Sequence, residues 1–149
     1  MATPAQRTNT WTLNEWDDQS VAGTTGGYIY DGSNGYELWG WGWANSGQLA
    51  QSVWSGTKYV DPIQIPGTWK TISGTQGLVS TVAVKTNGEL WSWGYNLSGE
   101  LGNNLSGPTA SRSSPIQLPG TNWNSATKGA STWATRTNGT LWAWGNNQQ

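Results

Sequence analysis

The side chains that most often carry chemistry are scarce in this sequence. It contains no cysteine and no histidine, which excludes thiolate nucleophiles, thiolate metal sites and imidazole general bases. Asp17 and Asp18 form the only adjacent acid pair, but neighbouring residues of a strand point to opposite faces and do not suit paired catalysis. Phosphate loops, dinucleotide fingerprints and nucleophile elbows do not occur. We therefore expect no catalytic residues and no enzymatic activity.

Metal, cofactor and nucleic-acid sites are also not expected. The segment Asp31-Gly32-Ser33-Asn34-Gly35 has oxygen ligands and glycines, but it lacks the full spacing and the closing glutamate of a helical calcium loop. A turn is the better interpretation. The seven lysines and arginines are scattered and the net charge is −1, whereas nucleic-acid binding needs clustered positive charge.

The 149 residues are dominated by a tandem repeat. Leu38-Trp39-Gly40-Trp41-Gly42 returns 52 residues later as Leu90-Trp91-Ser92-Trp93-Gly94, and 51 residues after that as Leu141-Trp142-Ala143-Trp144-Gly145. The segments 62–67 and 115–120, Pro-Ile-Gln-Ile/Leu-Pro-Gly, keep a similar step of 53. Several markers in one order at one period are typical of stacked structural repeats.

Each repeat predicts β-strands. The dipeptides Asn87-Gly88 and Asn138-Gly139 are typical of two-residue hairpin turns, because both residues tolerate a positive φ. In the strand that returns from the turn, alternate residues point to opposite faces, so the two tryptophans share one face and leucine lies on the other. We expect an all-β fold of tandem antiparallel sheets, with a repeat core of Leu38, Trp39, Trp41, Leu90, Trp91, Trp93, Leu141, Trp142 and Trp144.

The chain is expected to form one domain with two parts. Residues 1–35 fit the period poorly, and we interpret them as an N-terminal arm with a degenerate first repeat; residues 36–149 form the repeat region. The first residues do not resemble a secretory signal, and no stretch approaches the roughly 20 apolar residues of a membrane span. We expect no membrane association.

The repeat resembles that of the regulator of chromosome condensation family. The clearest copy runs from Trp69 through Lys85-Thr86-Asn87-Gly88 and Trp91-Ser92-Trp93-Gly94 to Gly102 and Pro115, and the resemblance covers residues 36–149. It implies β-propeller blades of about fifty residues. A histidine often found before the hairpin is absent. The chain holds about three blade-equivalents, which predicts an incomplete propeller unless the protein is oligomeric; two copies would make a six-bladed ring.

A second resemblance concerns function. The opening Thr8–Trp16 and the Trp-rich repeats are similar to proteins of tailed phages, especially marine and cyanobacterial ones. This resemblance implies a non-enzymatic virion protein, made in the host cytoplasm, that decorates the capsid or belongs to the tail or fibre apparatus. The expected partners are further copies of the chain or other virion proteins.

Three tryptophans lie off the repeat pattern and support an alternative. A flat indole ring can pack on the face of a sugar, and Trp11, Trp54 and Trp133 are the best candidates for exposed interface or glycan contacts. The alternative function is therefore a lectin-like, glycan-binding module. A third hypothesis is a cellular propeller fragment that regulates a protein partner.

Overall fold

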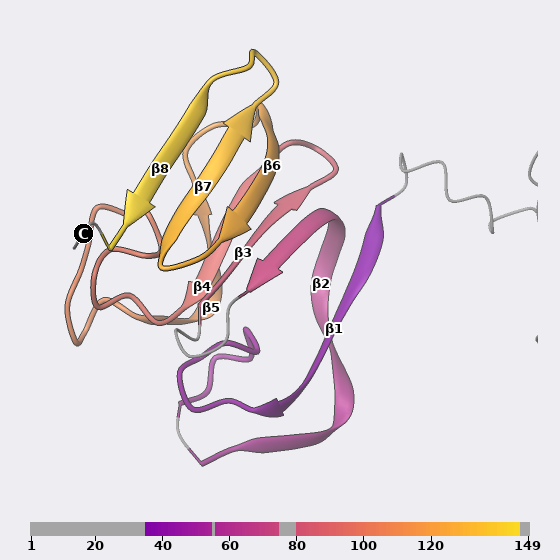
Figure 1. The fold of residues 1–149 in the computed structure, drawn as a ribbon. Coiled ribbons are helices and arrows are strands. Elements are labelled where there is room, and N and C mark those ends of the chain that lie inside the picture. The colour runs from indigo at the N-terminus through magenta and orange to yellow at the C-terminus, as the bar shows by residue number, and fades with distance from the viewer. Residues whose placement is uncertain (1–34, 55, 75–79, 147–149) are drawn as a thin grey trace, which may run out of the picture. The chain divides into compact units, whose positions relative to one another are not determined.

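A computed structural model of the chain describes residues 35–54, 56–74 and 80–146, and these residues form strands, turns and loops without any helix (Figure 1). The strands are β1 (Tyr36–Trp43), β2 (Lys58–Gly74), β3 (Ser80–Lys85), β4 (Leu90–Gly94), β5 (Arg112–Leu118), β6 (Trp123–Lys128), β7 (Ser131–Arg136) and β8 (Leu141–Gly145). The prediction of an all-β fold is confirmed.

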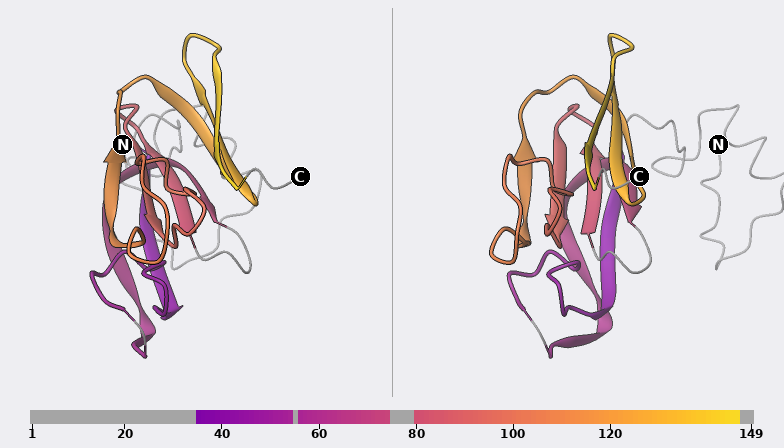
Figure 2. Two further views of the ribbon diagram at one scale, coloured as in Figure 1. Left: turned by 90° about the vertical axis from the view of Figure 1, so that its left-hand side faces the viewer. Right: turned by 60° about the vertical axis from the view of Figure 1, so that its left-hand side comes forward.

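The strands form two antiparallel sheets. The order is β1-β2-β3-β4-β5 in the larger sheet and β6-β7-β8 in the smaller one. β2 has 17 residues and takes part in two ladders: Ile65 in its first half pairs with Leu38 of β1, whereas Ile72 in its second half pairs with Ala83 of β3. Figures 1 and 2 show β6–β8 as a second layer beside β2 and β3.

The sequence repeat divides these strands into blades. The equivalent residues Leu38, Leu90 and Leu141 begin or lie in β1, β4 and β8. The first blade therefore comprises β1 and residues 58–66 of β2. The second blade is complete, with residues 68–74 of β2 followed by β3, β4 and β5, and the third blade comprises β6, β7 and β8. The predicted tandem blades are thus present, and within the described residues one four-stranded blade lies between a two-stranded and a three-stranded one.

The hairpin turns differ in type from the one that the sequence predicted. Gly88 N donates to Lys85 O over 3.0 Å, and Lys85 N donates to Glu89 O over 2.9 Å. Gly88 has a φ of 81° but Asn87 is not among the residues with positive φ. The loop therefore has three residues, a tight turn followed by a glycine bulge, instead of the expected two. The turn at Gly139 repeats this geometry, with a φ of 85°.

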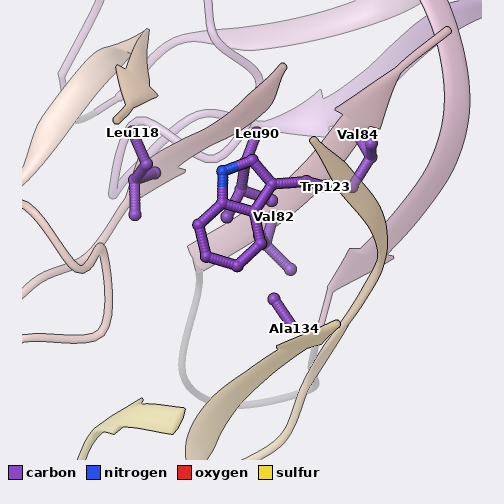
Figure 3. Close-up of a cluster of buried hydrophobic side chains, with 6 residues drawn as sticks. All are labelled: Val82, Val84, Leu90, Leu118, Trp123 and Ala134. Atoms are coloured by element: carbon purple, nitrogen blue, oxygen red, sulfur yellow. The ribbon is translucent and has the colours of Figure 1, made fainter. Parts of the chain in front are cut away.

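Two buried clusters hold the blades together. Between the second and third blades, the cluster comprises Val82, Val84, Leu90, Leu118, Trp123 and Ala134 (Figure 3). Between the first and second blades, it comprises Ile65, Trp69, Ala83 and Trp93. A fully buried tryptophan removes roughly 150–250 Å² from water, or about 4–6 kcal/mol before opposing entropy is subtracted. The tryptophans therefore supply much of the cohesion of a small stack.

Some expectations fall on residues 1–34, which lie outside the described residues. They are the N-terminal arm with its degenerate repeat, Trp11, the pair Asp17 and Asp18, and most of the turn Asp31–Gly35. Over the ranges that the structure does describe, no helix is long and apolar enough to cross a membrane.

Candidate functional site

Each junction between blades contains a tryptophan that reaches back to the preceding blade. Trp93 of β4 donates from Nε1 to the carbonyl oxygen of Gln48 over 2.8 Å. Trp144 of β8 donates from Nε1 to the carbonyl oxygen of Glu100 over 3.0 Å. Gln48 and Glu100 are 52 residues apart, in the loops after β1 and β4. The same hydrogen bond thus recurs with the period of the sequence.

The loops that supply these carbonyl groups are fixed by their own side chains. Gln48 Oε1 accepts a hydrogen bond from Ser46 N over 2.9 Å, and Glu100 Oε2 accepts one from Ser98 N over 2.8 Å. The loop thus holds the acceptor in place for the next blade's tryptophan. The junction is therefore a repeated structural unit and not a chance contact.

Asn96 organises the loop after β4. Its side chain is fully buried, and Nδ2 donates to the carbonyl oxygens of Leu105 and Ala110 over 3.0 and 3.2 Å. Its Oδ1 accepts from Leu101 N over 2.9 Å. The repeat includes this asparagine as Gly-x-Asn, which recurs at Asn147, whereas Ala44 occupies the equivalent position in the first blade. The sequence did not single out Asn96 as a site residue, because its role depends on the backbone groups that it binds.

A cation lies over the tryptophan at the start of two hairpin strands. Lys85 Nζ is 4.1 Å from the ring centre of Trp91. Arg136 Cζ is 4.5 Å from the ring centre of Trp142 and 4.4 Å from that of Trp123. Each such contact contributes about 0.5–1 kcal/mol at an exposed site. The equivalent placement of Lys85 and Arg136, visible in the sequence, thus has a packing role.

The indole N–H of this tryptophan also has a repeated acceptor. Glu89 Oε2 accepts from Trp91 Nε1 over 3.1 Å and lies 3.6 Å from Lys85 Nζ. Hydrogen bonds from Trp91 and Asn87, together with the charge of Lys85, lower the pKa of Glu89. In the third blade, Thr140 Oγ1 replaces the carboxylate and accepts from Trp142 Nε1 over 3.2 Å.

One end of the described stack exposes two tryptophans, which we call the tryptophan face. Trp39 is 46% exposed and Trp41 is 64% exposed, and they are two residues apart in β1. Their equivalents in the second blade, Trp91 and Trp93, contribute to the cluster that packs on the first blade. Trp39 and Trp41 are exposed because no described blade lies before β1.

The other end exposes the opposite side of a blade, which we call the leucine face. Leu141 is 61% exposed and Trp133 is 45% exposed. They correspond, at a step of 51, to Leu90 and Val82, both of which are buried against the third blade. Trp133 therefore lies on the repeat pattern after all. Counting from the Asn-Gly turns would have revealed this, but the change from valine to tryptophan concealed it.

The predicted repeat-core residues thus separate by position in the stack. The structure buries Leu90 and Trp93, half-buries Leu38, Trp91 and Trp144, and exposes Trp39, Trp41, Leu141 and Trp142. The buried ones come from the blade that has a neighbour on both sides. The burial of the four exposed residues in a core stays a prediction, because it requires a partner that covers them.

Trp54, predicted as an interface or glycan contact, lines an open hollow of about 520 Å³. Trp54 is 47% exposed, and Ser111, Ser113 and Ser114 lie on the same lining as Arg112. Arg112 Nη1 donates to backbone carbonyls of its own loop, at 2.9 Å for Ser111 O. The hollow thus combines an aromatic plane with hydrogen-bonding groups.

Carboxylates do not gather in the described part of the chain. Within residues 35–54, 56–74 and 80–146, no three histidine, cysteine, aspartate or glutamate side chains come together as a possible metal site. The arrangements that do recur are apolar contacts, backbone acceptors and cation–aromatic pairs. These contacts pack one blade against the next.

Comparison with known proteins supports the repeat and the fold. The family model described as the regulator of chromosome condensation (RCC1) repeat matches residues 87–131, from the β3–β4 turn to the start of β7. This match, together with the blades, confirms the predicted resemblance at the level of the repeat.

Two solved structures of Prp20 from the yeast Saccharomyces cerevisiae are similar to this chain. One, described with the binding of Prp20p to Gsp1p and histones, has a TM-score of 0.58 and 20% identity over 73% of this chain and 29% of that chain. The other, yeast RCC1 (Prp20) bound to Kap60, has a TM-score of 0.54 and 20% identity over 80% of this chain and 29% of that chain. This chain thus spans less than a third of their length, and the likeness shows the fold alone.

Proposed function

We propose that this protein is a non-enzymatic structural protein that acts through protein–protein contacts of its β-blades, within the particle of a tailed phage. The observation that carries the contact function is the exposure of Trp39, Trp41, Trp133 and Leu141 at the two ends of the stack. The assignment to a capsid decoration, tail or fibre is supported by the similarity of the opening Thr8–Trp16 and the Trp-rich repeats to proteins of such phages.

The amount of exposed aromatic surface supports a partner. Isolated apolar residues on a surface are ordinary, but contiguous apolar patches mark interaction sites. Trp41 and Trp39 share one strand, and aromatic residues are enriched at the centres of interfaces, where charged residues are depleted. Only 10% of the residues are charged. Covering these faces with protein therefore stabilises an assembly more than leaving them in water.

The test of this proposal is the presence of the chain in purified particles. In a lysate from infected cells, we expect the chain to sediment with intact capsids or tails through a density gradient, and to remain with them after a wash in high salt. Apolar contacts persist in salt, whereas contacts between exposed charges are screened. A chain found only among free proteins at the top of the gradient would contradict a role in the particle.

The hollow beside Trp54 supports glycan binding as a second candidate function. Trp54 offers a flat apolar ring for a sugar face, and Ser113 and Arg112 lie on the same lining. The measurement is retention on a glycan array, followed by titration of a retained glycan. Trp54→Ala should abolish retention, whereas Trp43→Ala, at a tryptophan that is 52% exposed and outside the hollow, should preserve it. Absence of binding across a broad array would remove this candidate.

A further inference from the structure

We infer that the tryptophan face of one copy binds the leucine face of a second copy, so that chains associate head to tail. This inference rests on the proposed function, because it specifies a partner for the exposed faces. The partner of each exposed face is another copy of the same chain. The two junctions within the chain already display the geometry of such a contact.

Both internal junctions are built from equivalent residues in the same order. At the first, Leu38 and Ile65 of the leading blade contact a cluster that contains Trp93 of the following blade. At the second, Leu90 and Leu118 of the leading blade belong to a cluster against which Trp144 of the following blade packs. In each case the leading blade presents its leucine side and the following blade presents its tryptophan side.

The two exposed faces are the unused halves of this same junction. The tryptophan face carries Trp41, the equivalent of Trp93, and no described residue plays the part of the leading leucine against it. The leucine face carries Leu141, the equivalent of Leu90, with Trp133 at the position of Val82. Bringing Leu141 of one copy against Trp41 of another repeats a contact that the chain makes twice internally.

The tryptophan face is oriented before any partner arrives. Trp39 Nε1 donates to Glu37 Oε2 over 3.2 Å, as Trp91 Nε1 does to Glu89 Oε2 over 3.1 Å inside the stack. A ring that is already fixed loses less conformational entropy on binding. The hydrogen bond that orients Trp91 inside the stack thus also orients Trp39 on the exposed tryptophan face.

This contact is heterologous, because it joins two different faces. A heterologous contact either closes into a ring or continues as a filament, whereas a contact between two like faces stops at a dimer. The internal junctions give no example of leucine side against leucine side, or of tryptophan side against tryptophan side. The distinction provides a direct test.

The test uses sedimentation of the full chain and of two variants, each with one face blocked by a charge. Trp41→Glu blocks the tryptophan face and Leu141→Glu blocks the leucine face; both positions are exposed, so the monomer accommodates the charge. The wild type should associate as its concentration rises. Each variant alone should remain monomeric, with a dissociation constant at least about tenfold higher, which corresponds to roughly 1.4 kcal/mol.

The decisive sample is an equimolar mixture of the two variants. Each retains the face that complements the other, so the mixture should form a 1:1 complex and nothing larger. Leu97→Ala, at an exposed loop position that belongs to neither face, is the control and should associate as the wild type does. Urea unfolding of every variant at low concentration verifies that the fold is intact.

Three results would overturn the inference: a wild type that stays monomeric at all concentrations, a single variant that still self-associates, or a mixture that forms no complex. These outcomes are separable from the proposed function. A chain that sediments with particles but never self-associates keeps the particle role and loses the head-to-tail contact. A chain that self-associates but is absent from particles does the reverse.

Discussion

Gly88 lies so close to the backbone carbonyl group of Thr121 that no β-carbon fits between them. This contact joins the β3–β4 turn to the segment that leads into β6, and Trp123 N donates to Gly88 O over 3.0 Å at the same place. Gly139 occupies the equivalent turn of the third blade, where a β-carbon would meet no described atom within 4 Å. Alanine at either position would be strained by the positive φ, but only alanine at position 88 would also clash with a neighbouring backbone. Comparing the two substitutions therefore distinguishes the cost of the strain from the cost of the clash.

Gly139→Ala should cost about 1–2 kcal/mol of unfolding free energy, because alanine is strained at positive φ. Gly88→Ala should cost about 1–3 kcal/mol more, because the neighbouring backbone must move. Urea denaturation of both variants measures the difference. Equal losses would show that the turn and the Thr121 segment are not in contact.

Trp93→Ala should lower the free energy of unfolding by about 3–5 kcal/mol, because it leaves a cavity between two blades. Trp93 is fully buried, and its ring centre is 5.8 Å from that of Trp69. The control is Trp41→Ala at the equivalent exposed position, where we expect a change within about 0.5 kcal/mol. Both are measured at low protein concentration, so that association does not contribute. Similar losses at the two positions would contradict the assigned burial.

Asn96→Ala should destabilise the protein by at least about 2 kcal/mol, since it removes the partners of several buried backbone groups. The effect should be centred on the loop after β4, with loss of protection from proteolysis there. Asn45→Ala, at an exposed position one residue after the equivalent Ala44, should be nearly neutral. A neutral Asn96→Ala would mean that water satisfies these groups equally well.

Because Lys128 is buried, we expect the free energy of unfolding to depend on pH in the alkaline range. Its side chain is 7% exposed and its Nζ donates to Gly129 O over 2.7 Å. Burial lowers its pKa below the ordinary value of 10.5, and the charge of Glu100 partly opposes this. The folded state therefore releases the proton at a lower pH than the unfolded state does, and between the two pKa values stability rises with pH.

The measurement is the free energy of unfolding of the wild type and of Lys128→Met from about pH 7 to the ordinary lysine pKa of 10.5. The wild type should gain stability relative to the variant as the pH rises, because the cost of the buried charge disappears. The comparison cancels the titration of the remaining lysines and tyrosines. A difference that stays constant with pH would show that the ammonium group is well solvated.

Much of the fold follows from local patterns in the sequence. The step between Leu38, Leu90 and Leu141 defines the period, and the Asn-Gly pairs locate the hairpins between β3 and β4 and between β7 and β8. The alternation of Leu90 with Trp91 and of Ser92 with Trp93 separates the two faces of β4. The turns and the alternation are set by residues near one another in the chain, and the period is set by recurring residue types, which is why the sequence reveals them.

The features that the sequence did not reveal depend on partners without a side-chain signature. Trp93 and Trp144 bind backbone carbonyls, and a carbonyl of Gln48 or Glu100 has no residue type to recognise. The loop that Asn96 holds has a counterpart after β1, where Ala44 replaces the asparagine, and the pattern does not show which backbone groups the side chain binds. The exposure of Trp39 depends on which blade lies beside it, and a local pattern does not contain that information.

The length of β2 has a consequence for how the stack comes apart. Because Ile65 and Ile72 lie in one continuous strand but pair with different neighbours, separating the first two blades requires that strand to lose one of its ladders. Ideal repeat proteins open one unit at a time, since each repeat meets its neighbours only at a face. Here the amide protons of β1, β2 and β3 should instead exchange with solvent as one cooperative unit, because the shared strand β2 belongs to both blades and prevents them from opening separately.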